Sequence, residues 1–249
     1  WDLPTLNQLG FIDHLGPEKG DILGTLAGQT AEQLHARKAE YKSNVIGSGE
    51  TPALQLSSGE VISESEIVCE YIDAVSESTG PRLVPTDPLI SSRVRLSMKR
   101  FNAVPPAMIA LLKNQDMEKD EERAADLDKH LDVFTKTLEV EGSFCHSSTP
   151  TLADCHCGPF LFRFGAVLRY YRNYDVVTKF PRLGTLLQAL EDLHEWAQVL
   201  SPVDKSQYSP ITEEKLCSFY EQYANNMQWG KSEDGSVVLV GRGKRLKVS

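Results

Sequence analysis

The stretch that decides the fold reads TPALQLSSGEVISESEIVCEYIDAV and spans residues 51–75. Two short apolar segments, at 53–56 and 60–62, are separated by a polar linker that ends in Gly59. A glycine suits the backbone angles of a tight turn between two strands. The sequence therefore predicts a β-hairpin here.

A helix is predicted directly after this hairpin. Ser63 is placed to cap it, with Glu66 three residues on, and apolar residues then recur at helical spacing from Ile67 to Val75. Upstream, residues 31–41 are rich in good helix formers. The expected order is helix, hairpin, helix.

The remainder of the chain indicates helices and a terminal hairpin. A linker rich in Ser, Thr, Gly and Pro covers residues 76–88, and helical patterns follow from Leu89 to about Met227. Leucines and a tryptophan form a wide stripe over residues 183–196, after Pro181. Beyond Gly230 we expect residues 237–240 and 244–248 to pair around the turn Gly241-Arg242-Gly243.

The composition and net charge of the chain disfavour some classes of partner. The chain has 249 residues, of which 41% are hydrophobic, enough for two small domains. A net charge of -9 disfavours nucleic acid and anionic membranes as partners, and no apolar run is long enough to span a bilayer. Five cysteines, an odd number, indicate the cytoplasm or another reducing compartment. Residue 1 is Trp rather than Met, so an organellar location stays open.

Thr51-Pro52 and Glu64-Ser65 are the candidate binding residues. If the peptide bond before Pro52 is cis, the backbone of Thr51 can pair with a bound peptide as a strand would. Glu64-Ser65, in the first turn of the predicted helix, can hold a carboxylate at its free N–H groups. Taken singly, an X-Pro turn and a capped helix start are equally compatible with purely structural roles.

Together these signals resemble the glutathione-binding domain of omega-class glutathione transferases. The resemblance is carried by Lys38-Ala39-Glu40-Tyr41, by residues 47–54 and 64–73, and by Leu83 to Pro88. Thr151-Leu152-Ala153-Asp154 is a capping box that in this family opens the central helix of the second domain. The resemblance covers roughly residues 38 to 229.

This resemblance implies a fold and a ligand. It implies a thioredoxin-like α/β domain, complete or incomplete, over residues 1–78, with 1–37 atypical. It also implies an all-helical domain over 88–229 and an extension over 230–249. It implies that glutathione is the ligand and substrate, with no metal, and that an unidentified small molecule or disulfide is the acceptor. The implied glutathione contacts are Lys38, Thr51, Pro52, Glu64 and Ser65.

The family's catalytic nucleophile has no counterpart in the sequence. Glutathione transferases place a Cys, Ser or Tyr at the first strand-to-helix junction, but no Cys or Tyr precedes Tyr41 and no Ser precedes Ser43. An ungapped register puts Phe11 at the omega cysteine, and Thr5 is a remote hydroxyl candidate. The segment can be incomplete, degenerate or replaced by an unrelated piece, and the catalytic residue stays unknown.

Two functions follow as alternatives. The first is an omega-type protein that binds glutathione and catalyses thiol transfer or conjugation. The second is a catalytically inactive protein of the same fold that acts as a scaffold or as a subunit of a larger assembly. In either case, a homodimer is among the expected partners.

Other polar residues favour structural roles. Cys155-His156-Cys157 lies in a predicted helix, where successive side chains diverge, so buried packing cysteines are expected instead of a metal site. We also expect Cys69 in a helix core. Tyr170 to Tyr174 can line an acceptor pocket or pack at a domain interface. The basic end from Arg242 to Lys247 can dock an anionic partner or form a solvated hairpin.

Overall fold

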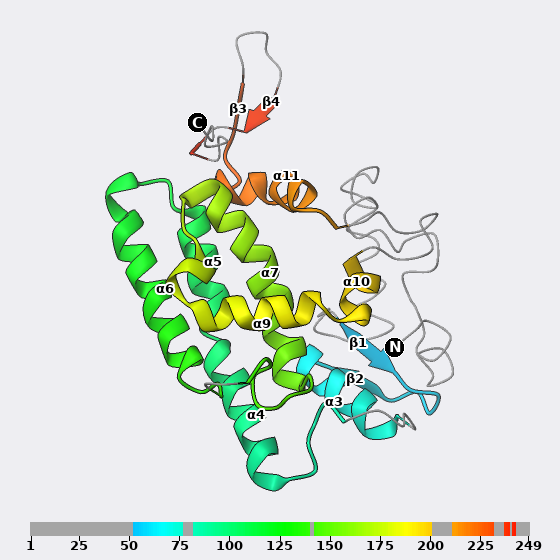
Figure 1. The fold of residues 1–249 in the computed structure, drawn as a ribbon. Coiled ribbons are helices and arrows are strands. Elements are labelled where there is room, and N and C mark those ends of the chain that lie inside the picture. Colours follow the sequence, from blue (N-terminus) through cyan, green and yellow to red (C-terminus); the bar gives the residue numbers. More distant parts are fainter. Residues whose placement is uncertain are drawn as a thin grey trace. The chain divides into compact units, whose positions relative to one another are not determined.

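A computed structural model of the chain describes residues 52–76, 82–139, 142–200, 211–231, 237–239 and 241–242. The described residues belong to two compact units, one of residues 52–76 and one that begins at residue 82 (Figure 1). The predicted helix at 31–41 lies outside the described residues. Within the described part, no helix is both long and apolar enough to cross a membrane.

The first unit begins with the predicted hairpin. Strands β1 (Ala53–Gln55) and β2 (Val61–Ser63) are antiparallel, and Leu54 pairs with Ile62. Gly59 adopts a φ of 90°, and its N–H donates to the Leu56 carbonyl oxygen at 2.9 Å. Glycine reaches this conformation without a steric penalty, so the turn forms where the sequence predicts it.

Helix α3 (Ser65–Val75) follows, but its start differs from the prediction. Ser63 still belongs to the ladder, opposite Ala53, so it cannot cap the helix. Glu64 is the N-cap instead, and its carbonyl oxygen accepts from the Val68 N–H at 2.9 Å. The expected cap was therefore wrong by one residue, because the strand runs directly into the helix.

The second unit is helical. Its elements are α4 (Pro88–Phe101), α5 (Val104–Lys113), the 3-10 helix η2 (Met117–Lys119), α6 (Asp120–Thr135), α7 (Leu152–Arg172), α8 (Val176–Lys179), α9 (Pro181–Glu191), α10 (His194–Leu200), α11 (Glu213–Ala224) and the strands β3 (Trp229–Lys231) and β4 (Val237–Leu239). Helix α7 contacts α4, α5, α8, α9 and α11. It is the element around which this unit packs (Figure 1).

The start of α7 carries the predicted capping box. Asp154 is fully buried, and its carboxylate accepts from the Thr151 N–H and from the Thr151 hydroxyl, both at 2.7 Å. The same carboxylate accepts from the Cys145 N–H at 2.8 Å. One buried side chain thus satisfies the helix start and anchors the loop before it.

Two details differ from the sequence-based expectation. The stripe over 183–196 is divided between α9 and α10, where the Leu193 N–H donates to the Leu190 carbonyl oxygen at 3.0 Å and ends α9. Strand β4 pairs with β3, and Trp229 lies opposite Leu239. A three-residue strand is too short to show alternation, so the sequence could not indicate this partner. Residues 244–248 lie outside the described residues.

Candidate functional site

The first unit brings three of the predicted binding residues to one end of its hairpin. Because Ala53 pairs with Ser63, the residues on either side of that pair, Pro52 and Glu64, lie at the same end. Ser65, the first residue of α3, follows immediately. All three predicted residues are exposed, so a ligand can reach them.

Glu64 has an unusual backbone conformation. Its φ is 72° and its ψ is 119°, outside the regions that side-chain-bearing residues favour. Such a conformation costs about 1–3 kcal/mol, and residues that hold one cluster at functional sites. Glycine would avoid the cost, yet the position carries an exposed glutamate.

The start of α3 can accept an anion. The first N–H groups of a helix have no carbonyl partner within it, and the helix dipole adds partial positive charge there. Glu64 makes no side-chain capping hydrogen bond to these groups. A carboxylate placed at Ser65 would therefore meet both unsatisfied donors and a favourable field.

Two predicted ligand contacts cannot be placed. Lys38 and Thr51 lie outside the described residues, and so does the part of the Thr51-Pro52 peptide that belongs to Thr51. The site of the first unit therefore rests on Pro52, Glu64 and Ser65.

The aromatic cluster at the end of α7 is largely structural. Tyr171 is buried and donates to the Cys217 carbonyl oxygen at 2.6 Å, while Tyr174 donates to the Asp128 carboxylate at 2.5 Å. Tyr170 borders a shallow hollow beside α11, with Glu213. The hydroxyl groups of Tyr171 and Tyr174 thus form hydrogen bonds within the fold.

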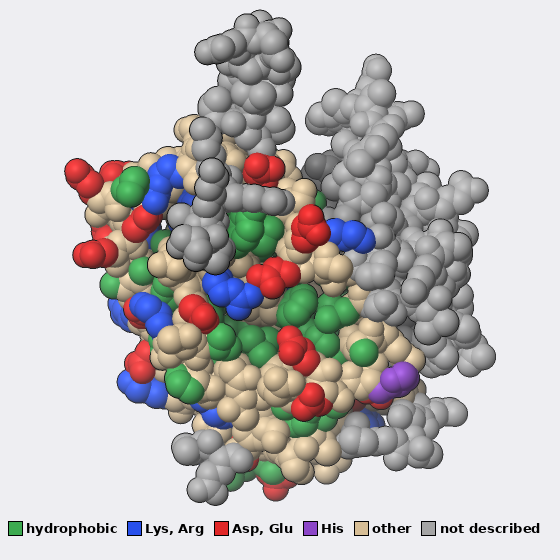
Figure 2. Space-filling model, turned by 45° about the horizontal axis from the view of Figure 1, so that its top comes forward, with side chains coloured by type: hydrophobic (Ala, Val, Ile, Leu, Met, Phe, Trp, Pro, Cys, Tyr) green, Lys and Arg blue, Asp and Glu red, His purple; other side chains and the backbone are tan. Residues whose placement is uncertain are grey.

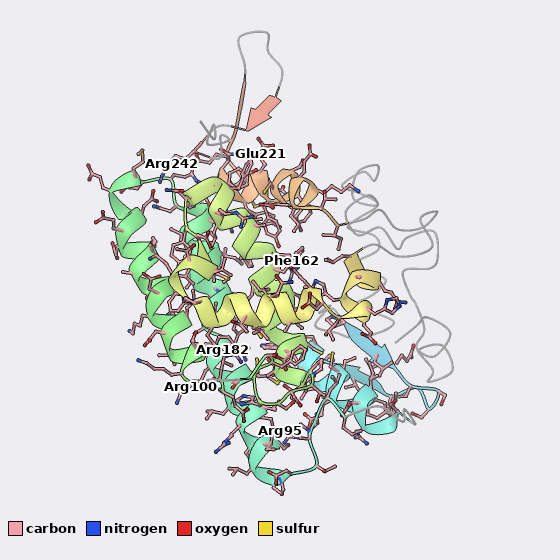
Figure 3. The ribbon with its side chains drawn as sticks, in the orientation of Figure 1. Arg95, Arg100, Phe162, Arg182, Glu221 and Arg242 are labelled. Atoms are coloured by element: carbon pink, nitrogen blue, oxygen red, sulfur yellow. The ribbon has the colours of Figure 1, made fainter. Side chains whose placement is uncertain are left out.

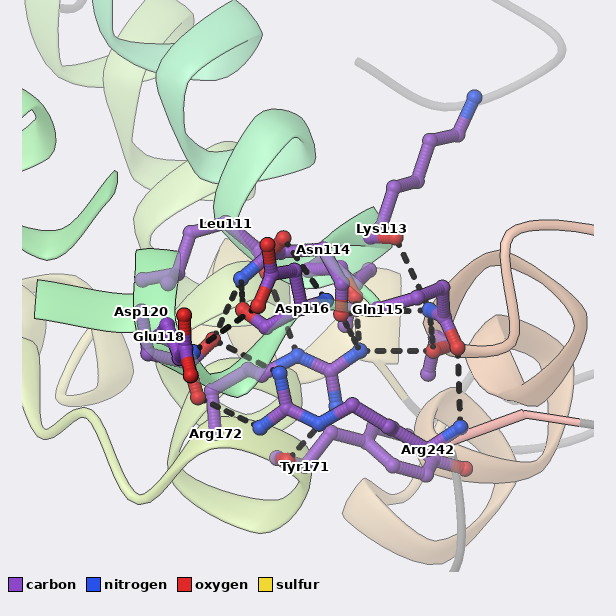
Figure 4. A network of polar contacts seen from close by, with 12 residues as sticks. Leu111, Lys113, Asn114, Gln115, Asp116, Glu118, Asp120, Tyr171, Arg172 and Arg242 are labelled. Carbon is purple, nitrogen blue, oxygen red and sulfur yellow. Dashed lines mark hydrogen bonds and ion pairs between the residues drawn. The ribbon is translucent and has the colours of Figure 1, made fainter. Parts of the chain in front are cut away.

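Arg172 has a role that the sequence did not indicate. Its guanidinium donates to backbone carbonyls at the ends of α5, α7 and α11 (Figure 4), and the acceptors are those of Leu111, Leu112, Asn114, Tyr171 and Ala224. Burial lowers the pKa of Arg172 to about 10, which leaves it charged at neutral pH. Arg172 therefore joins three helix ends. The Gln115 side-chain amide also donates to two of the same carbonyls, those of Asn114 and Ala224, so the helix ends share a small network of donors.

Arg242, from the predicted basic end, is part of the same region. Its guanidinium pairs with both carboxylate oxygens of Asp120, at 2.9 and 2.5 Å, and its N–H donates to the Gln115 side chain (Figure 4). The other basic residues of that end lie outside the described residues. For Arg242, an intramolecular ion pair replaces the expected exposed charge.

One face of the helical unit has a hollow of about 280 Å³, lined by both apolar and charged residues of α7, α8, α9 and the start of α11. Figure 2 shows hydrophobic side chains gathered on this face, with acidic and basic ones around them. Phe162 lies in the hollow and packs edge-on against Trp196, with ring centroids 5.8 Å apart. Its border includes the ion pair between Arg169 and Glu213, at 2.6 Å.

The cysteines differ from the expectation in two cases. Cys157 is buried, but Cys155 is exposed and Cys69 is half-buried, because successive residues of a helix point in different directions. The Sγ atoms of Cys145 and Cys157 lie 3.9 Å apart. Among the described residues, no group of three or more His, Cys, Asp or Glu side chains is arranged to hold a metal ion.

Comparisons with known proteins match parts of the chain to glutathione S-transferases. Residues 102–195 match the model of the C-terminal domain of glutathione S-transferase. Glutathione S-transferase omega-1 of Mus musculus is 25% identical over 127 residues, 51% of this chain and 51% of the relative. The omega-1 enzyme of Sus scrofa is 33% identical over 104 residues, 40% of this chain and 42% of the relative. The chain spans about half the length of the curated relatives it matches.

The fold agrees with that of a solved glutathione transferase structure. Glutathione transferase Omega 3C from Trametes versicolor superimposes with a TM-score of 0.59 at 22% identity, over 76% of this chain and 75% of that chain. This likeness, with the helical unit and the two-stranded sheet, confirms the predicted fold class, a thioredoxin-like α/β domain followed by a helical domain. Residues 102–195 therefore belong to a C-terminal domain of the glutathione S-transferase type, and the chain is similar to omega-class enzymes over about half of its length.

Proposed function

We propose that this chain binds glutathione at the start of α3, through Glu64 and Ser65. The observation that carries the proposal is the strained backbone of Glu64, with φ at 72°, directly before an exposed helix start. A fold without a use for this conformation would gain stability from a glycine there.

The chemistry of the ligand matches these groups. The γ-glutamyl end of glutathione carries one ammonium and one carboxylate on the same carbon. Glu64 supplies a carboxylate for the ammonium, while the Ser65 hydroxyl and N–H donate to the ligand carboxylate. The two ligand charges are thus met by adjacent residues of the chain.

Three further predicted contacts complete the proposed site. The backbone of Thr51, before Pro52, pairs with the ligand's peptide groups as a neighbouring strand would. Lys38 supplies the positively charged side chain of the proposed site. The register of β1 and β2 supports this arrangement, since it sets Pro52 at the same end as Glu64.

We further propose that bound glutathione takes part in thiol transfer or conjugation to a small electrophile or a disulfide. The curated relatives are named glutathione S-transferases. The nucleophile is not assigned, since no Cys precedes Cys69 and no Tyr precedes Tyr41. A homodimer or a larger assembly is a further expectation of this proposal.

Two assays test the proposal. The first measures retention of the protein on immobilised glutathione, and the second measures turnover of a small electrophile and of a mixed disulfide. Ser65→Ala and Glu64→Gln should each weaken retention, by about tenfold or more in affinity, because each removes a charge-assisted hydrogen bond. Ser58→Ala and Glu60→Gln are matched controls, since both are exposed and lie in the turn at the other end of the hairpin.

The outcomes separate the two functions. Retention with turnover supports an enzyme. Retention without turnover rejects catalysis and leaves a binding protein. If wild-type protein is not retained, or the control variants weaken retention as much as Ser65→Ala, the site at α3 is refuted.

A further inference from the structure

Two buried cysteines of the helical unit face each other. The Sγ atoms of Cys145 and Cys157 are 3.9 Å apart, and both side chains are fully buried. Cys145 lies in the segment between α6 and α7, and Cys157 lies in the second turn of α7. The two sulfurs would need to approach by about 2 Å to reach the bond length of a disulfide.

The backbone around Cys145 is fixed on both sides. Its N–H donates to the Asp154 carboxylate at 2.8 Å, and its carbonyl oxygen accepts from the Glu139 N–H at 3.0 Å. This anchoring holds the Cys145 sulfur over α7. The backbone of Cys145 is therefore held beside α7, within reach of Cys157.

Arg182, at the start of α9, holds the segment from outside. Its guanidinium donates to the carbonyl oxygens of Phe144, at 2.6 Å, and Glu139, at 2.8 Å (Figure 3). The residue before Cys145 is thus pinned to another helix. Breaking this clamp is the simplest route by which a small oxidant could reach the buried sulfurs.

We propose that Cys145 and Cys157 form a redox modification site, which a peroxide converts to an intramolecular disulfide when the segment held by Arg182 opens. One sulfur, as its thiolate, attacks a peroxide oxygen; the O–O bond breaks, and a sulfenic acid and one water form. The second thiol attacks that sulfur, the S–S bond forms, and the oxygen leaves as a second water. The thiols lose two electrons, and hydrogen peroxide takes them up.

The closed fold protects the pair. The hydrogen bond with Cys157, together with burial, raises the pKa of the Cys145 thiol, so it is scarcely ionised at neutral pH. Oxidation is therefore expected to be slow in the wild type. Its rate should follow the opening of the segment.

The test is mass mapping of the full chain after exposure to hydrogen peroxide. Free thiols are alkylated, the protein is digested, and the peptides of Cys145 and Cys157 are followed with time. We expect a cross-linked pair, two hydrogens lighter than the separate peptides, which dithiothreitol separates. Arg182→Gln should accelerate its formation severalfold.

Two further variants serve as controls for this experiment. Arg169→Gln also removes an arginine, whose ion pair with Glu213 lies away from this segment, and should leave the rate unchanged. Cys145→Ser should abolish the cross-link without creating a new one to Cys157. The proposal is overturned if the two cysteines, in the wild type and in Arg182→Gln, stay alkylatable or become separate sulfinic acids without any cross-link.

Discussion

An Nη2 atom of Arg172 lies 2.7 Å from the carbonyl oxygen of Ala224 and joins the last turn of α7 to the last turn of α11. The two residues are 52 positions apart in the chain. Helix ends leave four carbonyls without intrahelical donors, and one guanidinium has five N–H groups in a fixed fork. A single side chain can therefore close several helix ends together.

Replacing Arg172 should destabilise the helical unit markedly. Arg172→Met removes donors from several part-buried carbonyls and should lower the free energy of unfolding by about 2–4 kcal/mol. Arg169→Met, three residues earlier on the same helix, breaks an exposed pair with Glu213 and should cost less than about 1 kcal/mol. Urea unfolding followed by circular dichroism measures both. Equal losses in the two variants would contradict the special role of Arg172.

Two glycines of α7 should respond oppositely to alanine. A Cβ on Gly158 would lie 2.6 Å from the Cδ1 atom of buried Leu190, whereas one on Gly165 meets no atom within 4 Å. Gly165→Ala should stabilise the protein by about 0.5–1 kcal/mol, because alanine is the better helix former. Gly158→Ala should destabilise it by about 1–2 kcal/mol through overpacking. Thermal unfolding of the pair checks this, and a gain in both variants would refute the tight contact at Gly158.

The sequence predicted those elements whose signals are local. The hairpin around Gly59, the capping box of Thr151 and Asp154, and the proline at the start of α9 all depend on a few neighbouring residues. The structure places each of them where the pattern indicated. Local chemistry decides turns and caps, so a single sequence is enough to find them.

Contacts between distant residues could not be predicted. The carbonyls around Arg172 come from three helix ends, and the sulfurs of Cys145 and Cys157 meet because a loop folds back onto α7. Neither arrangement produces a recognisable spacing of residues along the sequence. The strain at Glu64 was equally invisible, since the pattern placed the cap at Ser63 and the ladder decided otherwise.

The stability of the helical unit should depend on pH through His146. This side chain is buried; its Nε2 lies 2.6 Å from the Ser97 hydroxyl, and its Nδ1 has no partner. Burial lowers the pKa of His146 below its ordinary value of 6.5, with Asp154 and Glu139 opposing the shift. The unfolded chain therefore takes up this proton first, and stability is lost as the pH falls below 6.5.

His146→Gln should make the stability of the helical unit less dependent on pH. The free energy of unfolding, measured in urea from pH 7 to pH 5, should fall less steeply in the variant than in the wild type. His194, which is exposed, provides the control, and His194→Gln should keep the wild-type slope. If His146→Gln also keeps the wild-type slope, the pKa of His146 does not differ between the folded and unfolded states as expected.

The contribution of the ion pair between Arg242 and Asp120 should be lost in a more acidic pH range. The hydrogen bond from Arg242 lowers the pKa of Asp120, so its contribution is present above the ordinary value of 3.8 and is lost as the pH falls through the folded-state value. A double-mutant cycle with Asp120→Asn and Arg242→Gln should show coupling at pH 7 that fades in acid. Coupling that is absent at pH 7, or unchanged in acid, would show that the ion pair does not form in solution.

Calorimetric titration of the full chain with glutathione and with cysteinylglycine, which lacks the γ-glutamyl group, tests the central claim most directly. The wild type should bind glutathione more tightly than it binds the dipeptide. Ser65→Ala should bind glutathione at least about tenfold more weakly than the wild type does. In this variant, the preference for glutathione over the dipeptide should be lost. Equal binding of the two ligands by the wild type, or unchanged glutathione binding by Ser65→Ala, would contradict recognition of the γ-glutamyl end at the start of α3.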